Sequence, residues 1–389
     1  MTVYYDIALN GYPPGETVAG KVLPLTQINQ ILGLFKPTLY DRSQLASSNK
    51  TTITIYAGLQ VAINGKIYFT QEDKTITVAD FVDAASRKGK DCYIYACQPS
   101  DANSFSPNIV ISLNSTVPTG YTAANSRKIG GFHCMCADVG TKIGSSHPYY
   151  GYVAGDIIPI SMWDLRHLPE AEPEGMVYIR NIGKWVDIYL VSWTGSKLQS
   201  AYGATIADGA TTHTTGSGIH GEKFVEYLGE VKKRLMTRDE FIVIAQGTPE
   251  LVNINGSSDP GTTGGHVMTN GYRCISNFAL EDCTGVLWQW VQDQYEYWPG
   301  TTIPSDIENN KWLSGYSWNY ASASVYNKNC DSAMHGSAYG ILRRSLVGGD
   351  WGLGAYCCPQ CVTCNNFSSH LDSVFSARGV AEPRRMLSV

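Results

Sequence analysis

Four cysteines near the C-terminal end of the chain have the spacing that most suggests chemistry. In "YCCPQCVTCNN" (356–366), Cys358, Cys361 and Cys364 follow a C-x2-C-x2-C pattern, and Cys357 directly precedes it. This spacing is typical of an iron–sulfur segment, which also needs a fourth cysteine about three residues on, followed by proline. Here "NNF" follows instead, so the iron–sulfur pattern is incomplete.

Zinc is the second possible ligand of these thiols. A tetrahedral site could recruit Cys274, Cys283 or Cys330, but structural zinc sites normally use two paired C-x2-C knuckles, and only one region of this chain has them. Local disulfides or free thiols on a loop are simpler interpretations. Because the eleven cysteines cannot all pair within the chain and no signal peptide is recognisable, we expect reduced thiols and no cofactor.

No pattern of a hydrolytic enzyme is present either. The eight histidines are scattered, and neither H-E-x-x-H nor G-x-S-x-G occurs. A mildly acidic stretch is more simply a solvated face than a calcium site. It contains Asp282, Asp293, Glu296, Asp306 and Glu308. We therefore assign no catalytic residue and no metal ligand.

The composition indicates a globular protein of more than one domain. The 389 residues are 43% hydrophobic and 16% charged, and the length exceeds that of one ordinary core. The net charge of −5 and the lack of a dense Lys/Arg stripe argue against nucleic acid as a partner. No apolar stretch reaches roughly 18 residues, so we expect no membrane insertion.

The elements that would position these residues fall into three regions. Residues 1–47 include "LTQINQILGLF", which predicts a short amphipathic helix in an N-terminal attachment or oligomerisation segment. From Thr51 apolar and polar residues alternate, and Asn64-Gly65 between "LQVAI" and "KIYF" is a strong hairpin signal. We expect a small antiparallel β domain at 48–149, with strands also at 92–97 and 108–113.

The third region, 150–389, begins within a Gly-, Ser- and Tyr-rich connection at 140–155. It opens with the strands "MVYIR" and "KWVDIYLVSW", followed by a helix within "EKFVEYLGEVKK". In "TRDEFIVIAQG", Thr237 is the expected N-cap, Glu240 completes a capping box and Gly247 ends the helix. Trp288 and Trp290 are expected in the core. Beyond them, "GYSWNYASASVY" has the composition of a binding loop, from which we select Tyr316, Trp318 and Tyr320.

Three C-terminal segments are similar, in order, to those of one protein family. "VLWQWV", "LVGGDWGLGAYCC" and "FSARG" resemble the aromatic strand, Gly-Gly-x-Trp turn and terminal Ala-Arg-Gly strand of diversity-generating retroelement variable proteins. Upstream segments such as "VAINGKIYFT", "SRKIGGFH" and "WVDIYL" also resemble that family, from about residue 48 onward. The resemblance implies an α+β fold, with a C-terminal C-type-lectin-like domain at 150–389, a small antiparallel β-sandwich at 48–149 and a short N-terminal segment.

The function implied by the resemblance is display of a hypervariable face that binds a bacterial surface protein or glycan receptor. The carrier would be a homotrimer on a phage or prophage tail fibre, beside other tail-fibre components, in a virion or at a cell surface after synthesis in the host cytoplasm. The implied variable, ligand-binding positions are Asp350, Gly352, Leu353, Gly354, Tyr356, Thr363, Asn365, Asn366, His370, Asp372 and Val374. The implied scaffold consists of Gly348, Gly349, Trp351, Ala377, Arg378 and Gly379.

Two other functions are associated with the same type of fold. Formylglycine-generating enzymes oxidise cysteine with copper held by two cysteines, and Cys358 lies close to one of those positions. Cys361 and Cys364, however, lie on either side of the expected second position. Calcium-dependent lectins carry Glu-Pro-Asn, Gln-Pro-Asp or Trp-Asn-Asp signatures, which are absent. We therefore favour a receptor-binding protein that is not an enzyme.

Overall fold

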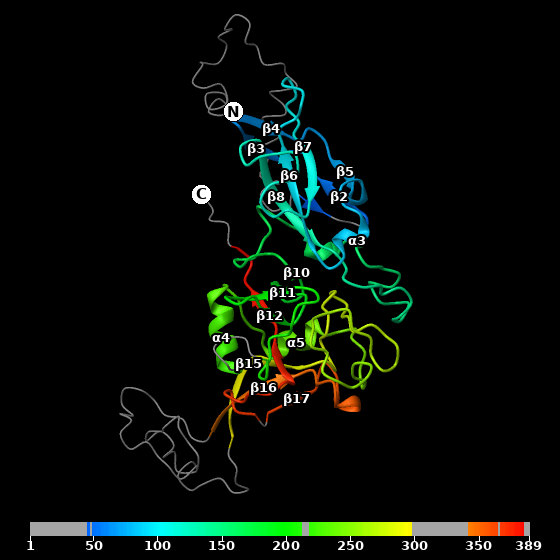
Figure 1. Ribbon diagram of the computed structural model, residues 1–389, viewed down its shortest axis with the longest axis vertical. Coiled ribbons are helices and arrows are strands. Elements are labelled where there is room, and N and C mark those ends of the chain that lie inside the picture. The colour runs from blue at the N-terminus through cyan, green and yellow to red at the C-terminus, as the bar shows by residue number, and fades with distance from the viewer. Residues whose placement is uncertain (1–44, 47–48, 212–217, 298–340, 365, 385–389) are drawn as a thin grey trace, which may run out of the picture.

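The computed structural model describes residues 45–46, 49–211, 218–297, 341–364 and 366–384 (Figure 1). The predicted N-terminal helix and the positions Tyr316, Trp318, Tyr320 and Asn365 lie outside these residues. The described chain is mostly β with few helices. None of its helices is long and apolar enough to cross a membrane.

One end of the molecule is built from the first nine strands (Figure 1). Three sheets occur here, with strand orders β1-β2-β5, β3-β4 and β7-β6-β8-β9. The strands are β1 (Leu45–Ala46), β2 (Thr52–Ile55), β3 (Gln60–Ile63), β4 (Lys66–Phe69), β5 (Lys74–Thr77), β6 (Asp91–Cys97), β7 (Asn108–Ser112), β8 (Ser126–His133) and β9 (Trp163–Asp164).

Local turn chemistry explains the hairpin of β3 and β4. Asn64 and Gly65 connect the two strands with φ of +50° and +74°, the conformation that favours Asn-Gly in a two-residue hairpin. The predicted hairpin is therefore confirmed, as are the strands predicted at 92–97 and 108–113. Apolar side chains from these sheets, among them Ile53, Ile94 and Phe132, form one buried cluster.

The other end contains two four-stranded sheets and one two-stranded sheet. Their orders are β10-β11-β19-β14, β17-β16-β15-β18 and β12-β13, and among the described strands only β15 and β18 pair in parallel. The strands are β10 (Met176–Ile179), β11 (Lys184–Asp187), β12 (Val191–Trp193), β13 (Leu198–Ser200), β14 (Arg234–Leu235), β15 (Trp288–Tyr297), β16 (Ile341–Val347), β17 (Val362–Thr363), β18 (Phe375–Ala377) and β19 (Gly379–Ala381).

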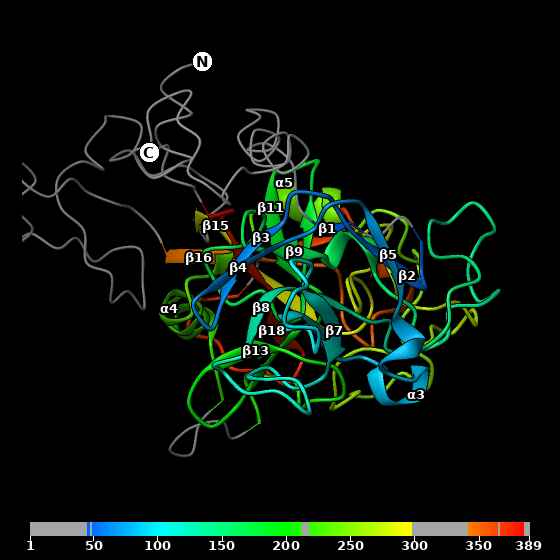
Figure 2. The same ribbon diagram turned by 90° about the horizontal axis from the view of Figure 1, so that it is seen from above.

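The two predicted helices are present at this end. The first is α4 (Gly221–Glu230) and the second is α5 (Arg238–Ile244). Thr237 and Glu240 form the expected reciprocal capping box, whereas α5 ends three residues before Gly247. The short helix α3 (Ala84–Arg87) was not predicted; Asp83 caps it, and Figure 2 shows α3 and α4 on opposite sides of the molecule.

Single-turn 3-10 helices complete the described elements. They are η2 (Val78–Asp80), η3 (Pro159–Ser161) and η5 (Gly354–Tyr356). The last of these lies between β16 and β17, at the end of the molecule farthest from the first nine strands (Figure 1).

Candidate functional site

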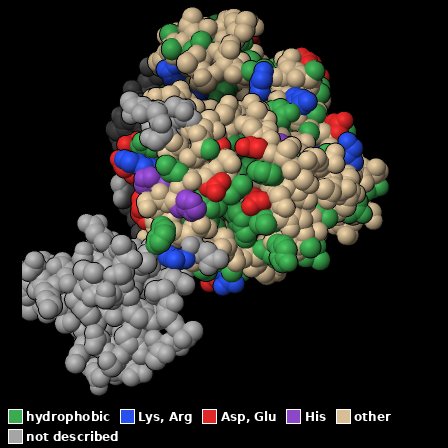
Figure 3. All heavy atoms as spheres, turned by 60° about the horizontal axis from the view of Figure 1, so that its bottom comes forward, with side chains coloured by type: hydrophobic (Ala, Val, Ile, Leu, Met, Phe, Trp, Pro, Cys, Tyr) green, Lys and Arg blue, Asp and Glu red, His purple; other side chains and the backbone are tan. Residues whose placement is uncertain are grey.

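The candidate face consists of residues 350–374, which connect β16 to β18. Strand β17 lies within this face and pairs with β16. The face therefore consists of two loops, one on each side of a short strand that belongs to the sheet. Figure 3 shows this end of the molecule, where hydrophobic side chains gather among scattered acidic and histidine side chains. The face is therefore a loop surface that is fixed at both ends by one sheet.

A tight turn of two glycines fixes the start of the face. Gly349 has a φ of +85°, and a Cβ at this position would lie 2.7 Å from the Sγ of Cys357. At Gly348, where φ is +96°, a Cβ would lie 2.5 Å from the carbonyl oxygen of Cys283. Only glycine fits such a backbone without displacing its neighbours. Trp351, the next aromatic residue, is partly buried beside the cluster that contains Val286 and Leu287.

Arg378 fixes the other end of the face. Its guanidinium is fully buried and donates to the side chain of Gln289 at 3.1 Å and to the backbone carbonyls of Asp187 at 2.8 Å and Ile188 at 2.6 Å. It also donates to the carbonyl of Glu281. One side chain thus joins several segments beneath the face. Ala377 is also buried, and Gly379 lies against the carboxylate of Asp187.

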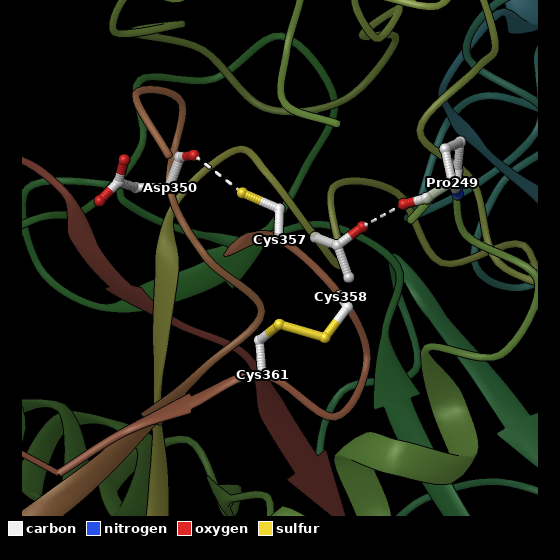
Figure 4. Close-up of a disulfide and its surroundings, with 6 residues drawn as sticks. Pro249, Asp350, Cys357, Cys358 and Cys361 are labelled. Carbon is white, nitrogen blue, oxygen red and sulfur yellow. Dashed lines mark hydrogen bonds between the residues drawn. A yellow bond between two sulfur atoms is a disulfide. The ribbon is translucent and has the colours of Figure 1, made fainter. Parts of the chain in front are cut away.

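The four cysteines of the segment have different environments. Cys357 is buried, its Sγ lies 3.3 Å from the carbonyl oxygen of Asp350, and burial raises the pKa of its thiol to about 12 (Figure 4). Such a thiol remains protonated and unreactive at neutral pH. Cys364 is a half-buried thiol, with its Sγ 3.8 Å from the Oγ of Ser345.

Cys358 and Cys361 form a disulfide, with an S–S distance of 2.14 Å (Figure 4). The expectation of reduced thiols is therefore wrong at these two positions, whereas the other cysteines of the described residues are free. Because Cys358 is already bonded to sulfur, its thiolate cannot act as the copper ligand of the enzyme alternative in this state. Within the described ranges, no three His, Cys, Asp or Glu side chains are grouped to hold a metal ion.

The proposed variable positions differ in exposure. Tyr356 is 74% exposed, and Gly352 and His370 are also exposed. Asp350 is only 9% exposed: its carboxylate accepts from the backbone N–H of Gly352 at 2.7 Å, and burial raises its pKa. The half-buried positions are Leu353, Gly354, Thr363, Asn366, Asp372 and Val374. The structure thus places Asp350 below the surface.

Several contacts fix side chains within the face. The Nδ1 of His370 lies 2.9 Å from the Oδ1 of Asn366, across one turn of the loop. Leu353 and Val374 pack against the cluster that contains Trp290 and Phe375. These two aliphatic side chains therefore contribute to the support of the loop as well as to its surface.

The sequence interpretation missed part of this surface. Val362, Phe367 and Leu371 are exposed apolar side chains in the same segment, and the guanidinium of Arg343 lies 4.9 Å from the ring centroid of Phe367. The signal was present, because apolar residues between turn residues in a loop are candidates for contact with a partner.

The interpretation of Asp282 as part of a solvated face is wrong. Its side chain is fully buried and lies 2.8 Å from the Nδ1 of His266. The backbone N–H of Gly264 donates to the second carboxylate oxygen at 2.6 Å. Opposite charge and two hydrogen bonds compensate for burial of this carboxylate.

Sheet order and loop surface together define a mostly β protein that presents a supported loop face at one end. Residues 43–164 match the family described as the Mtd second domain. The chain is also similar to the tail fiber receptor-binding protein of Bordetella phage BPP-1, with 30% identity over 269 residues. That match spans 64% of this chain and 65% of the phage protein, which is less than two thirds of its length.

Solved structures with the same fold are variants of the Major Tropism Determinant. The I1 variant has a TM-score of 0.65 and 25% identity, and the match covers 88% of this chain and 84% of that one. For the U1 variant the TM-score is 0.66 at 24% identity, with coverage of 89% and 84%. The resemblance that the C-terminal and upstream motifs indicated is confirmed, because the family model, the phage protein and these solved structures all match the chain.

Proposed function

We propose that this chain is a receptor-binding protein of a phage or prophage tail fibre, and that residues 350–374 are its hypervariable face. The observation that carries the proposal is a loop surface held between two buried supports, the Gly348-Gly349 turn and the strand that ends at Ala377. Such a support tolerates changes in the loop while the fold persists. The similarity to a tail fiber receptor-binding protein agrees with this role.

The proposal also covers the division of the chain into domains and the assembly of its copies. Residues 150–389 would form a C-type-lectin-like domain, residues 48–149 a β-sandwich and residues 1–47 an attachment segment. A homotrimer on a virion would present several copies of the face, so that modest affinity for each receptor is raised by effective concentration. We do not assign catalysis, and neither the disulfide at Cys358 nor the similar proteins support the copper enzyme.

Binding to bacterial cells tests the proposal directly. The fluorescently labelled full-length chain is incubated with a panel of bacterial strains, and cell-bound fluorescence is measured. At least one strain should bind, and the double variant Tyr356→Ala/His370→Ala should lose most of the signal because both side chains are exposed on the face. Tyr150→Ala is the matched control, since Tyr150 is an exposed tyrosine of the 140–155 connection.

Two results would contradict the proposal. The first is the absence of binding to every strain of a broad panel. The second is equal loss of binding in Tyr150→Ala and in the face variant. Retroelement diversification has its own test, because the DNA beside the gene should contain a near copy of its 3′ end that differs mainly at adenines, together with a reverse transcriptase gene.

A further inference from the structure

The disulfide between Cys358 and Cys361 is the most accessible sulfur bond that the described residues offer. Both cysteines are half-buried and lie in the turn between η5 and β17 (Figure 4). Seven of the eight free cysteines of the described residues are buried, all except Cys364. A thiol can exchange with a disulfide only where its thiolate can approach one of the two sulfurs, so exposed disulfides are the labile ones.

The buried thiols do not compete for this bond. Burial raises the pKa of the Cys97 and Cys357 thiols to about 12 and that of the Cys283 thiol to about 11, so these thiols are protonated at neutral pH. Cys357, next to Cys358 in the chain, donates its S–H to the carbonyl oxygen of Asp350 at 3.3 Å. A protonated thiol held in this way is a poor nucleophile, and the pair therefore behaves as a separate couple.

Main-chain contacts hold the two cysteines together without the help of their sulfurs. The N–H of Cys361 donates to the carbonyl oxygen of Cys358 at 3.1 Å, which closes a four-residue turn. The N–H of Gly348 donates to the carbonyl oxygen of Cys361 at 3.1 Å, and that of Leu251 to the carbonyl oxygen of Cys357 at 2.7 Å. These contacts keep the two thiols within reach of each other when the bond is open.

The short spacing limits how strongly the fold can favour the closed bond. For a ring of only four residues, the chain-entropy gain is about thirtyfold in the equilibrium constant of unfolding, against about two thousandfold for a loop of 100 residues. Coupling between folding and bond closure is reciprocal, so the fold favours closure of this bond by no more than the same factor. The fold therefore protects this bond from reduction far less than it would protect one that closes a long loop.

We infer that Cys358 and Cys361 form a redox-active couple, which opens and closes in the folded chain by exchange with a low-molecular-weight thiol. A thiolate attacks one sulfur, the S–S bond breaks, and the other cysteine leaves as a thiolate that takes a proton from water. A second thiolate then attacks the mixed disulfide and releases the protein dithiol and a low-molecular-weight disulfide. The two cysteines gain two electrons, and the two small thiols lose two. The reverse sequence closes the bond.

This couple makes the loop between η5 and β17 respond to the redox state of its surroundings. Reducing surroundings, such as a cytoplasm with abundant glutathione, favour the open form, in which only the main-chain contacts hold the turn. Oxidising surroundings favour the closed form, in which a covalent bond is added. The inference does not depend on receptor binding, so its test and that of the proposed function can fail separately.

Equilibration with glutathione tests the couple. The full-length chain is incubated without oxygen in mixtures of reduced and oxidised glutathione, a short maleimide pulse labels accessible thiols of the folded chain, and peptide mass spectrometry locates the label. Labelling of the pair should rise from about a tenth to about nine tenths over about a hundredfold change in the ratio of squared reduced to oxidised glutathione, as a two-electron couple requires. Cys357 should stay unlabelled throughout, because it is buried.

Variants of the segment supply the controls. Cys358→Ser/Cys361→Ser should show no response to the glutathione ratio, and Cys364→Ser should keep the native midpoint because it leaves the pair intact. Cys361→Ser/Cys364→Ser retains the half-buried Cys358 without a neighbouring accessible thiol. This variant should accumulate the mixed disulfide with one glutathione, which no second cysteine displaces.

Three results would overturn the inference. The first is a bond that stays closed at every ratio, or that opens only when Cys357 is labelled as well, since opening would then require unfolding. The second is a pair that is a dithiol at every ratio. The third is a difference between the unfolding midpoints of the open and closed forms well above about 5 °C, because so short a ring should not decide whether the chain folds.

Discussion

At the scale of single residues, His266 and Asp282 connect a buried charge to the support of the candidate face. The carbonyl of Asp282 accepts from the side chain of Gln289 at 3.2 Å, and Gln289 in turn accepts from Arg378. Asp282 itself has a φ of +62°, a conformation that aspartate tolerates better than most residues. The ion pair therefore holds a strained turn directly beneath the face.

This pair predicts a decrease in stability as the pH rises. Burial lowers the pKa of His266, but the charge and hydrogen bond of Asp282 outweigh burial, so the pKa is raised above 6.5. The folded state then binds a proton more tightly than the unfolded state does. The contribution should be complete below about pH 6.5 and should disappear as the pH rises through the raised pKa. Chemical denaturation between pH 6 and pH 9 measures it.

Substitution of His266 supplies the comparison. His266→Gln should lower the free energy of unfolding by about 3 kcal/mol at pH 6, because the buried charge of Asp282 loses its partner. The difference from the native chain should become smaller toward pH 9. His370→Gln, which removes an exposed histidine, is the control for loss of an imidazole elsewhere in the chain. An identical slope for His266→Gln and the native chain would contradict the assignment.

At the scale of elements, the sequence correctly predicted the turns and helix ends that depend on a few neighbouring residues. The Asn64-Gly65 hairpin and the Thr237/Glu240 capping box depend on a few consecutive residues, and both were found. The order of the C-terminal strands could not be predicted in this way. Strand β19 lies between β11 and β14, nearly two hundred residues from the former in the chain, and that pairing depends on burial from both sides.

The candidate face likewise combines features that the sequence predicted with features that it did not predict. Resemblance to a family predicted a variable loop in this segment, yet it did not indicate that Asp350 lies below the surface or that Leu353 and Val374 pack against a buried cluster. These features depend on contacts between distant segments. The cysteine spacing likewise permitted metal, free thiols or disulfides, and only the three-dimensional positions of Cys358 and Cys361 distinguish among them.

The disulfide should stiffen its loop more than it stabilises the fold. The loop is already attached through the N–H of Gly348 to the carbonyl of Cys361, and β17 pairs with β16 directly after it. Cys358→Ser/Cys361→Ser should therefore increase amide hydrogen exchange across residues 356–363. The loss in free energy of unfolding should be at most about 2 kcal/mol, the chain-entropy value for so short a loop.

Cys364→Ser serves as the control for this measurement. It removes a free thiol of the same segment and leaves the disulfide intact, so exchange across residues 356–363 should remain native. Dithiothreitol should reproduce the effect of the double variant in the native chain and should have no effect on the double variant. Native exchange after complete reduction would show that the backbone contacts alone hold the loop.

At the scale of the whole molecule, a polar chain and an apolar cluster join the two ends. His133, at the end of β8, lies 3.0 Å from Asp91 through Nδ1 and 2.9 Å from the hydroxyl of Tyr189 through Nε2. An apolar cluster also includes Tyr93 of β6 and Trp185 of β11. Asp91 lines a cavity of about 230 Å³ at this junction. These contacts join the first sheets to the part of the molecule that carries the candidate face.

This junction should couple the unfolding of the two ends. His133→Phe removes the imidazole that contacts both the buried Tyr189 hydroxyl and Asp91, and Tyr189→Phe removes that hydroxyl; each should cost about 1–3 kcal/mol. Because the hydrogen bond between His133 and Tyr189 is lost in both variants, the double variant should cost less than the sum of the two, by about 1 kcal/mol. Tyr95→Phe is the control, since the hydroxyl of Tyr95 donates to the carbonyl of Asn114 within one end of the molecule, and its cost in stability should be additive with that of His133→Phe.

Calorimetry of the full chain gives these values and also the shape of the transition. A single native-like transition with additive costs for His133 and Tyr189 would mean that the apolar cluster alone joins the two ends.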